Sequence, residues 1–215
     1  VQTCALPISE EGRSIALPYF KERGFSDATI QAFDLGYSPE GWDVFLKTAL
    51  KQGFSQEIIE KAGLVTQRNE EGKVYDRFRN RVIFPIHNVS GKVIAFGARI
   101  LKSDASKSSQ AKYLNSPETE VYHKSSILYG IAQAKNEIRN LDVCYLVEGY
   151  TDVISLHQAG IKNVVASSGT SLTTDQIKLI ARFTKHVTVL YDGDNAGIKA
   201  ALRGMDLILE EGLQV

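Results

Sequence analysis

Tyr145-Leu-Val-Glu-Gly-Tyr-Thr-Asp-Val153 and Val187-Thr-Val-Leu-Tyr-Asp-Gly-Asp-Asn-Ala-Gly197 are the two stretches that decide the fold. Each begins with a short apolar run of the kind that forms a buried strand, and each then turns to acids. Glu148 follows the first run, and Asp192 and Asp194 follow the second. Open α/β sheets place their ligand sites beyond the carboxyl ends of their strands. Because Mg²⁺ prefers hard oxygen ligands, the three acids predict a magnesium site at that edge.

The segment around these stretches alternates short apolar runs with helical patterns, which predicts right-handed βαβ units and a mainly parallel sheet. The Asp192-Gly-Asp194 turn follows its strand directly, and its glycine lets both carboxylates point into one site. The predicted strands are Val143–Val147, Asn163–Ala166 and His186–Tyr191, and the predicted helices are Asp152–Ala159, Thr174–Phe183 and Ala196–Glu211.

The first half of the chain has a different pattern, which predicts helices followed by an antiparallel meander. Polar residues at 102–111 indicate a mobile loop, and Asn115-Ser-Pro-Glu118 has the residue order of a helix start. The boundary between the halves is expected between Gly130 and Asp142. The predicted helices run from Ser26 or Asp27 to Phe33, from Ser55 to Ala62 and from Ile127 to Arg139, and the predicted strands are Val74–Phe78, Val82–Ile86 and Lys92–Ile100.

Composition excludes several classes of protein. The chain has 215 residues, of which 43% are hydrophobic, and no apolar run approaches the ~20 residues that span a bilayer. No secretion signal is visible, so we expect a cytoplasmic protein without membrane contact. Cys4, Cys144 and four histidines show no zinc-ligand spacing, and Cys144 is expected to pack in a core strand. Since the chain begins with Val1 and stops at Val215 after a predicted helix, we expect it to be a fragment.

Charge is unevenly distributed although the net charge is zero. Residues 73–124 contain ten Lys and Arg residues against four acids, which suits a phosphate backbone. Arg77, Arg79 and Arg81 alternate along a predicted strand and would share one face. Groups of charged residues are more often simply exposed to solvent, and this interpretation stays open for each cation taken individually. Further members of the basic region are Arg99, Lys112 and Lys124, with Tyr113, Tyr122 and Tyr129 interleaved as possible stacking surfaces.

The acids also have ordinary structural interpretations. An isolated Asp-Gly-Asp more often caps a helix or forms a turn, and Glu148 could be a helix-start acid favoured by the helix dipole. Asp152 could join the cluster or cap the next helix. The loop Ser167-Ser-Gly-Thr-Ser171 could offer N–H groups and hydroxyls to phosphate, or it could be an ordinary strand-to-helix connection.

Leu146-Val-Glu-Gly-Tyr-Thr-Asp-Val153 with Tyr191-Asp-Gly-Asp194 resembles the Toprim signature of bacterial primases, topoisomerases and some nucleases. Longer motifs make the chain similar, from about Leu17 to its end, to the RNA polymerase core of bacterial DnaG-type DNA primases. These motifs are Gly36-Tyr37 with Gly41-Trp-Asp43, Tyr75-Asp-Arg-Phe-Arg-Asn-Arg-Val-Ile-Phe-Pro-Ile86, Gly91-Lys-Val-Ile-Ala-Phe-Gly-Ala-Arg99 and Lys112-Tyr-Leu-Asn-Ser-Pro-Glu-Thr119.

The resemblance implies an α+β N-terminal subdomain of helices and antiparallel sheet, followed by a Rossmann-like α/β Toprim subdomain. The implied division is 1–13 without a match, 14–135 as the basic subdomain and 136–215 as the catalytic subdomain. By resemblance, Glu148, Asp192 and Asp194 bind metal and catalyse. The implied nucleotide- and nucleic-acid-binding residues are Arg77, Arg79, Arg81, Arg99, Lys112 and Lys124.

The activity that the resemblance implies is that of a nucleotidyltransferase, a DNA-directed RNA polymerase of the primase type associated with the bacterial replisome. It would use Mg²⁺, with Mn²⁺ as a possible substitute, to join ribonucleoside triphosphates into short RNA primers on single-stranded DNA. The family's zinc module, its helicase-binding C-terminal module and a further acidic pair are absent from the sequence. No zinc is therefore expected here, the replicative helicase would dock only through the missing module, and activity of this part alone stays open.

Three questions remain open at this stage. Glu148 could be a metal ligand or a general base. A different Toprim enzyme, a nuclease or a topoisomerase, is an alternative with the same acids. A non-catalytic nucleic-acid or replisome-binding module, in which the acids merely cap helices, is an alternative of another class.

Overall fold

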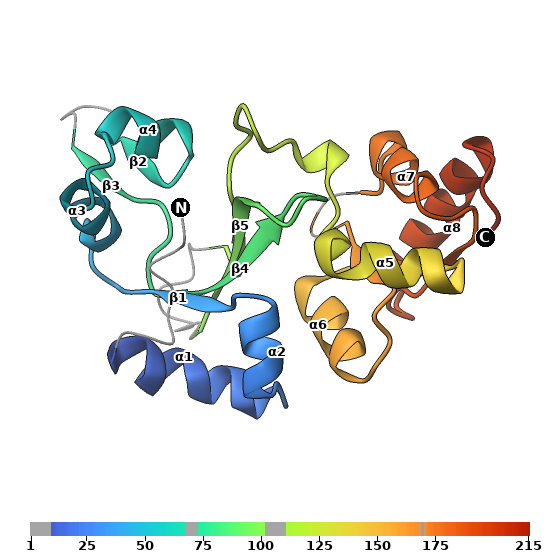
Figure 1. The fold of residues 1–215 in the computed structure, drawn as a ribbon, viewed down its shortest axis with the longest axis horizontal. Coiled ribbons are helices and arrows are strands. Elements are labelled where there is room, and N and C mark those ends of the chain that lie inside the picture. The colour runs from blue at the N-terminus through green and yellow to red at the C-terminus, as the bar shows by residue number, and fades with distance from the viewer. Residues whose placement is uncertain (1–9, 68–72, 102–110, 168, 170) are drawn as a thin grey trace. The chain divides into compact units, whose positions relative to one another are not determined.

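A computed structural model describes residues 10–67, 73–101, 111–167, 169 and 171–215. The chain forms two compact units. The first comprises Val1–Ile86 and Val93–Tyr122, and the second comprises His87–Lys92 and His123–Val215 (Figure 1). The predicted mobile loop at 102–111 lies outside the described residues except for Ala111.

The first unit is built on an antiparallel four-stranded sheet with the strand order β1-β4-β5-β6. A separate pair, β2 and β3, is also antiparallel. The strands of the larger sheet are β1 (Gly36–Ser38), β4 (Arg81–His87), β5 (Val93–Ile100) and β6 (Tyr113–Asn115), and those of the pair are β2 (Val65–Gln67) and β3 (Val74–Asp76). The helices of this unit are α1 (Glu10–Glu22), α2 (Asp27–Ala32), α3 (Val44–Lys51) and α4 (Gln56–Lys61).

Every residue of β4 is buried, because both faces of the strand meet apolar side chains. Phe84 packs edge-on against Phe20 of α1. Ile83, which points to the other face of the strand, belongs to a core cluster that includes Leu46 of α3 and Ile59 of α4. The sheet is therefore the middle layer of the unit, and burial on both faces explains why β4 reads as a continuous apolar run.

Helix α3 depends on an acid that lies thirty residues further along the chain. Its own N-cap residue, Asp43, makes no side-chain capping bond. Instead, the two carboxylate oxygens of Asp76 accept hydrogen bonds from the backbone N–H groups of Phe45 (2.7 Å) and Leu46 (3.0 Å). Asp76 is 2% exposed, and burial raises its pKa although both hydrogen bonds oppose that shift. The bonds satisfy two of the unpaired N–H groups that begin every helix.

Sequence reasoning was wrong on two features of this unit. The run Val74–Phe78 does not join the other two strands in a meander: β3 ends at Asp76 and pairs with β2 instead. No helix begins at Asn115-Ser-Pro-Glu118. The hydroxyl of Ser116 accepts the Phe96 N–H at 3.0 Å, and the Ser116 N–H donates to the Phe96 carbonyl at 2.8 Å. This serine therefore extends the contact with β5 and caps nothing.

The second unit is a parallel three-stranded sheet with helices, in the strand order β8-β7-β9. Its strands are β7 (Cys144–Val147), β8 (Val164–Ala166) and β9 (Val187–Val189), and its helices are the 3-10 turn η2 (Lys124–Ser126), α5 (Ile131–Leu141), α6 (Tyr150–Gln158), α7 (Thr174–Ala181) and α8 (Asn195–Glu210). All three predicted strands and all three predicted helices from Asp142 onward are present, and the strands are shorter than predicted. Figure 1 labels the helices α6, α7 and α8. The two units confirm the predicted fold class.

The core of the second unit contains Cys144, Leu146, Ile177, Ile180 and Ile208 among its fully buried residues. Cys144 is 0% exposed, as expected for a core strand, and burial raises the pKa of its thiol. Within the described part of the chain, no helix has the length and apolarity needed to cross a membrane.

The substitution Asp76→Asn should destabilise the first unit. An amide has one accepting oxygen, so one buried N–H at the start of α3 would lose its partner, at a cost of about 1–3 kcal/mol. Asp43→Asn is the matched control, since it loses an exposed pair with Lys47 that contributes about 0–1 kcal/mol and removes a like charge near Asp76, while both Asp76 hydrogen bonds remain. Urea denaturation of both variants measures the difference. Equal losses of unfolding free energy would contradict the assigned capping role of Asp76.

Candidate active site

The acids of the second unit lie where two neighbouring strands end. Strands β7 and β9 are parallel and paired directly, with Leu146 opposite Val189, and the Leu190 N–H donates to the Leu146 carbonyl at 2.8 Å. Glu148 is the first residue after β7, and Asp192 is the third after β9. Parallel pairing therefore brings both acids to the same edge of the sheet.

Glu148 is held against the loop that follows β9. Its Oε1 accepts a hydrogen bond from the backbone N–H of Asp192 at 3.1 Å. The same oxygen would lie 3.0 Å from a Cβ placed on Gly197, in the first turn of α8. The glutamate thus points toward the Asp192 loop, and its second oxygen is not used in this bond.

Asp194 caps the helix that follows. Its Oδ1 accepts the N–H groups of Ala196 at 2.9 Å and of Gly197 at 2.7 Å. Asp152 has a similar role at α6, where its Oδ2 accepts the N–H of Gly149 at 3.0 Å. The capping interpretation therefore applies to Asp194 and to Asp152. For Asp194 one carboxylate oxygen remains outside these bonds.

The donor chemistry suits a hard cation, although a three-acid cluster is not formed. Among the described residues, no three His, Cys, Asp or Glu side chains are placed together to hold a metal ion. Mg²⁺ in proteins commonly binds one or two carboxylates and completes its shell with water and substrate phosphates. The second oxygen of Glu148 and the exposed carboxylate of Asp192 match that requirement, so these residues fit the ion.

Tyr191 connects all three strand ends. Burial raises the pKa of its hydroxyl, a hydrogen bond with Ser167 lowers it in part, and the nearby charge of Glu148 raises it further. Ser167 follows β8 and Glu148 follows β7, so the phenol lies near residues at the ends of both strands. The proposed phosphate loop after Ser167 includes Ser168 and Thr170, which lie outside the described residues.

The predicted arginine stripe does not exist as a strand face. Only Arg81 lies in β4; Arg77 and Arg79 lie in the connection between β3 and β4, where Asn80 has a positive φ of 51°. The Arg77 Nη2 donates to the Asn115 carbonyl at 3.2 Å, and the Arg81 Nη1 donates to that of Lys112 at 3.4 Å. Both guanidinium groups have pKa values lowered by burial. These two arginines thus help to hold β6.

Arg79 has another environment. Its Nη1 donates to the Asp76 carbonyl at 2.5 Å, and its guanidinium lies 4.2 Å from the ring centre of Trp42 and 4.9 Å from that of Tyr75. Trp42 is 60% exposed. Arg79 therefore packs on two aromatic rings, but it lies near enough to Arg81 for its charge to lower the pKa of that guanidinium.

Arg99 and Lys112 are brought together at the β5–β6 edge. The Arg99 guanidinium lies near two aromatic rings, 5.3 Å from the centre of Tyr19 and 5.7 Å from that of Tyr113, and it also donates to the Tyr19 hydroxyl. The Lys112 ammonium lies 6.0 Å from the Tyr113 ring. Lys124, in contrast, belongs to the second unit, where its carbonyl accepts a hydrogen bond from Gln176.

Sequence reasoning missed two residues that shape these sites. Tyr19 lies eighty residues from Arg99, and no local pattern pairs them. Gly197 was read only as part of a helix start, but a Cβ there would lie 2.2 Å from the Asp192 carbonyl oxygen. The Asn195-Ala-Gly197 spacing after the acids was the available signal for a close backbone approach.

A parallel sheet with a glutamate after one strand and an Asp-Gly-Asp turn after its neighbour defines the Toprim class of α/β units, and a Toprim-like family matches residues 145–215. The family described as the DNA primase catalytic core, N-terminal domain, matches residues 5–135. The chain therefore belongs to the family of bacterial DnaG-type DNA primases.

Individual relatives agree with this assignment. The DNA primase of Clostridium acetobutylicum is 47% identical over 206 residues, which cover 95% of this chain and 33% of the relative. A crystal structure of a DNA primase domain from Pseudomonas aeruginosa is 41% identical with a TM-score of 0.85, and covers 97% of this chain and 64% of that chain. A structure of the DnaG primase catalytic domain bound to single-stranded DNA is 39% identical with a TM-score of 0.83, and the match covers 97% of this chain and 63% of that chain. The chain spans about a third of the length of the curated relatives it matches.

The close approach at Gly197 gives a test of the site's packing. Gly197→Ala should push the Asp192 backbone away from α8 and cost about 1–3 kcal/mol of unfolding free energy, as overpacking usually does. Gly204→Ala on the same helix is the control, because its Cβ would lie 3.5 Å from a Leu172 methyl group, an ordinary contact. That variant should be neutral or gain up to about 1 kcal/mol from helix propensity. If urea denaturation gives the two variants the same free energy of unfolding, the Asp192 backbone does not lie close enough to position 197 to exclude a methyl group.

Proposed function

We propose that this chain is the catalytic core of a primase, which synthesises short RNA primers from ribonucleoside triphosphates on a single-stranded DNA template. The activity is assigned to the longer protein, since the chain spans a third of its relatives. The proposal is supported most directly by the contact between the Glu148 carboxylate and the Asp192 backbone within a Toprim-like unit. A cytoplasmic location at the replisome and the division at 1–13, 14–135 and 136–215 belong to the same proposal.

Glu148, Asp192 and Asp194 are the residues that would hold Mg²⁺, or Mn²⁺ in its place. When bound, the ion lowers the pKa of the primer 3′-hydroxyl and neutralises charge on the triphosphate. The Asp192 N–H keeps one Glu148 oxygen in position, so the other oxygen is free to face a ligand. That second oxygen could instead accept the 3′-hydroxyl proton as a general base, and both roles are compatible with the same orientation.

The cations of the first unit would bind template and nucleotide phosphates. Arg99 is the best positioned, because two tyrosine rings and a hydroxyl fix its guanidinium and a fixed fork loses little entropy on binding phosphate. Lys112 is exposed beside it. Arg77 and Arg81 would act indirectly, because their hydrogen bonds hold β6 in place. Arg79 and Lys124 would contact phosphates at other positions, Arg79 beside Trp42 in the first unit and Lys124 in the second unit. The single-stranded DNA in the structure of a 39% identical relative supports this assignment of partner.

The substitution Asp192→Asn in the full-length protein tests the catalytic proposal. Loss of one carboxylate charge should abolish Mg²⁺-dependent incorporation of labelled ribonucleotides on single-stranded DNA, while the unfolding temperature changes little because the side chain is exposed. Asp206→Asn, an exposed acid on α8, should keep full synthesis. Unchanged synthesis by the Asp192 variant would refute the proposal, and Mg²⁺-dependent cutting of DNA without nucleotide consumption would indicate a Toprim nuclease.

Lys112→Gln tests the basic region of the first unit. Removing one phosphate contact should weaken binding of single-stranded DNA and reduce the slope of log K against log salt by about 0.7. Lys51→Gln, which removes an exposed cation from the end of α3, should leave the slope unchanged. Fluorescence anisotropy measures both. An unaltered affinity and slope in the Lys112 variant would remove this lysine from the nucleic-acid interface.

A further inference from the structure

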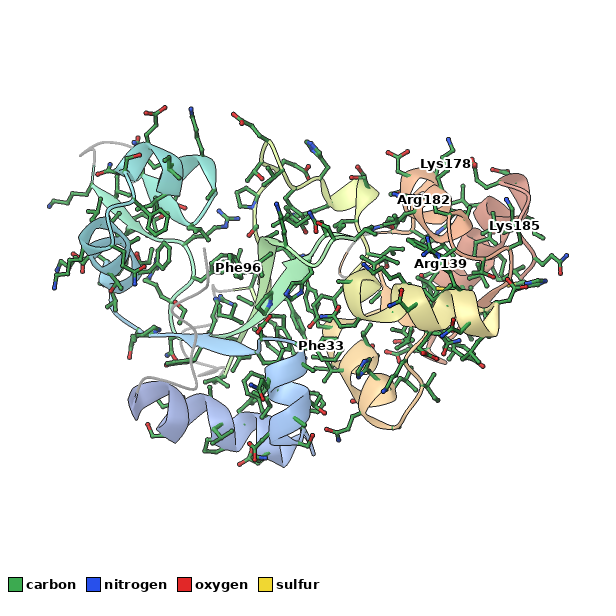
Figure 2. All side chains as sticks on the ribbon, viewed as in Figure 1. Phe33, Phe96, Arg139, Lys178, Arg182 and Lys185 are labelled. Carbon is green, nitrogen blue, oxygen red and sulfur yellow. The ribbon has the colours of Figure 1, made fainter. Side chains whose placement is uncertain are left out.

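The second unit carries a group of exposed cations that the proposed catalytic chemistry does not use. We call this group the α7 patch. Residues 178–186 contain three Lys or Arg residues and no acid, and one more arginine comes from the last turn of α5. Figure 2 labels these side chains on the second unit. The α7 patch consists of Arg139, Lys178, Arg182 and Lys185, all of them exposed.

One buried ring organises the centre of the patch. Phe183 is 8% exposed, and the guanidinium groups of Arg139 and Arg182 lie 4.9 Å and 5.8 Å from its ring centre. Lys178 precedes Arg182 by one helical turn, and Lys185 follows Phe183 by two residues. One arginine of α5 and the C-cap arginine of α7 thereby lie against the same ring. A guanidinium stacked on a ring keeps its N–H edges available for phosphate.

The charges of the patch are not neutralised locally. Lys21, Lys47 and Lys61 each form an ion pair, but none of the four patch residues does so with any part of the chain that the structure describes. The nearby acid Asp142 is engaged elsewhere: one carboxylate oxygen accepts the Thr184 hydroxyl at 2.8 Å and the other lies 3.1 Å from His186 Nδ1. Asp175 lies one turn before Lys178 on α7 but forms no ion pair with it, so the four cations and this single acid present a net positive charge to solvent.

The patch lies at the opposite end of the parallel sheet from the acids. Arg139 precedes β7 and Lys185 precedes β9, whereas Glu148 and Asp192 follow those strands. Strand β7 has four residues, which separates the two ends by about 13 Å. A ligand on the patch is thus distinct from one at the acidic edge.

We propose that the α7 patch is a second nucleic-acid surface, which binds the sugar–phosphate backbone and does not read bases. The aromatic ring within it is buried under the two arginines, so it offers no stacking platform. Fixed guanidinium groups flanked by flexible ammonium groups suit a row of phosphates. This inference goes beyond the catalytic site, and it requires only that the longer protein meets nucleic acid.

The test uses the double variant Lys178→Gln/Arg182→Gln in the full-length protein. Binding of a labelled duplex and of a labelled single strand of the same sequence is followed by fluorescence anisotropy between ~50 and ~200 mM salt. Removing two phosphate contacts should reduce the slope of log K against log salt by about 2 for the duplex and somewhat less for the single strand. A loss confined to one of the two arms identifies the form that binds the patch, because equal contacts with both forms would lower both slopes in the ratio of about 0.9 to 0.7.

The matched control is Lys162→Gln/Arg203→Gln, which removes one exposed lysine and one exposed arginine elsewhere on the same unit. It should leave the slope unchanged. A wild-type slope in the patch variant, an equal loss in the control, or no DNA binding by the wild-type protein would overturn the proposal. Poly-glutamate serves as a probe for an acidic protein. If the patch variant loses binding of poly-glutamate while its DNA slope is unchanged, the proposal is also overturned and the partner is an acidic protein.

Two further variants separate nucleic-acid binding by the patch from a purely structural role of its cations and from the catalytic proposal. Cations near helix carboxyl ends also offset the helix dipole, and such a role would lower the unfolding temperature without changing the DNA slope. If the double variant fails to fold, Lys185→Gln, which lies between α7 and β9, should still reduce the duplex slope by about 0.9. Asp192→Asn should leave the slope intact, so failure of the catalytic proposal and failure of the patch give different results.

Discussion

The parallel pairing of β7 with β9 is the constraint on which the candidate active site depends. Their register places Glu148 and the Asp192 loop at one edge, forty-four residues apart in sequence. The Glu148 carboxylate then accepts the Asp192 N–H, which fixes an otherwise flexible side chain against the backbone. Only a glycine at position 197 leaves space for this approach. The pairing of β7 with β9, one hydrogen bond and the lack of a side chain at Gly197 thus determine where Glu148 and the Asp192 loop lie.

The second unit was largely predictable because its signals are local. Apolar runs bounded by helical patterns predicted β7, β8 and β9 in order, and parallel pairing followed from the helices between them. Most of the boundaries shifted by only a few residues, as at β9. The positions of the acids beyond the strand ends were predictable for the same reason, since Glu148 follows β7 directly and Asp192 and Asp194 lie three and five residues after β9. Their exact roles were not predictable, because whether a carboxylate oxygen caps a helix or faces a ligand depends on orientations that no spacing encodes.

The first unit was less predictable because its key contacts are distant in sequence. Helix α3 was missed, and its start is stabilised by Asp76 rather than by the adjacent Asp43. The predicted arginine stripe required one long strand, but the chain leaves β3 after Asp76 and turns at Asn80. Alternating charge indicates a shared face only where the strand continues. The carbonyl partners of Arg77 and Arg81 could be seen only in three dimensions.

The structure also changes how the acids should be understood. Capping and ligand binding were treated as competing interpretations, yet Asp194 uses one oxygen for the N–H groups of Ala196 and Gly197 and keeps the other. Glu148 divides its oxygens in the same way. A carboxylate already anchored by a backbone N–H needs little further ordering to meet a cation, and preorganisation of this kind lowers the cost of binding. The bonds that stabilise the loop and the start of α8 are therefore compatible with the chemistry proposed at that edge of the sheet.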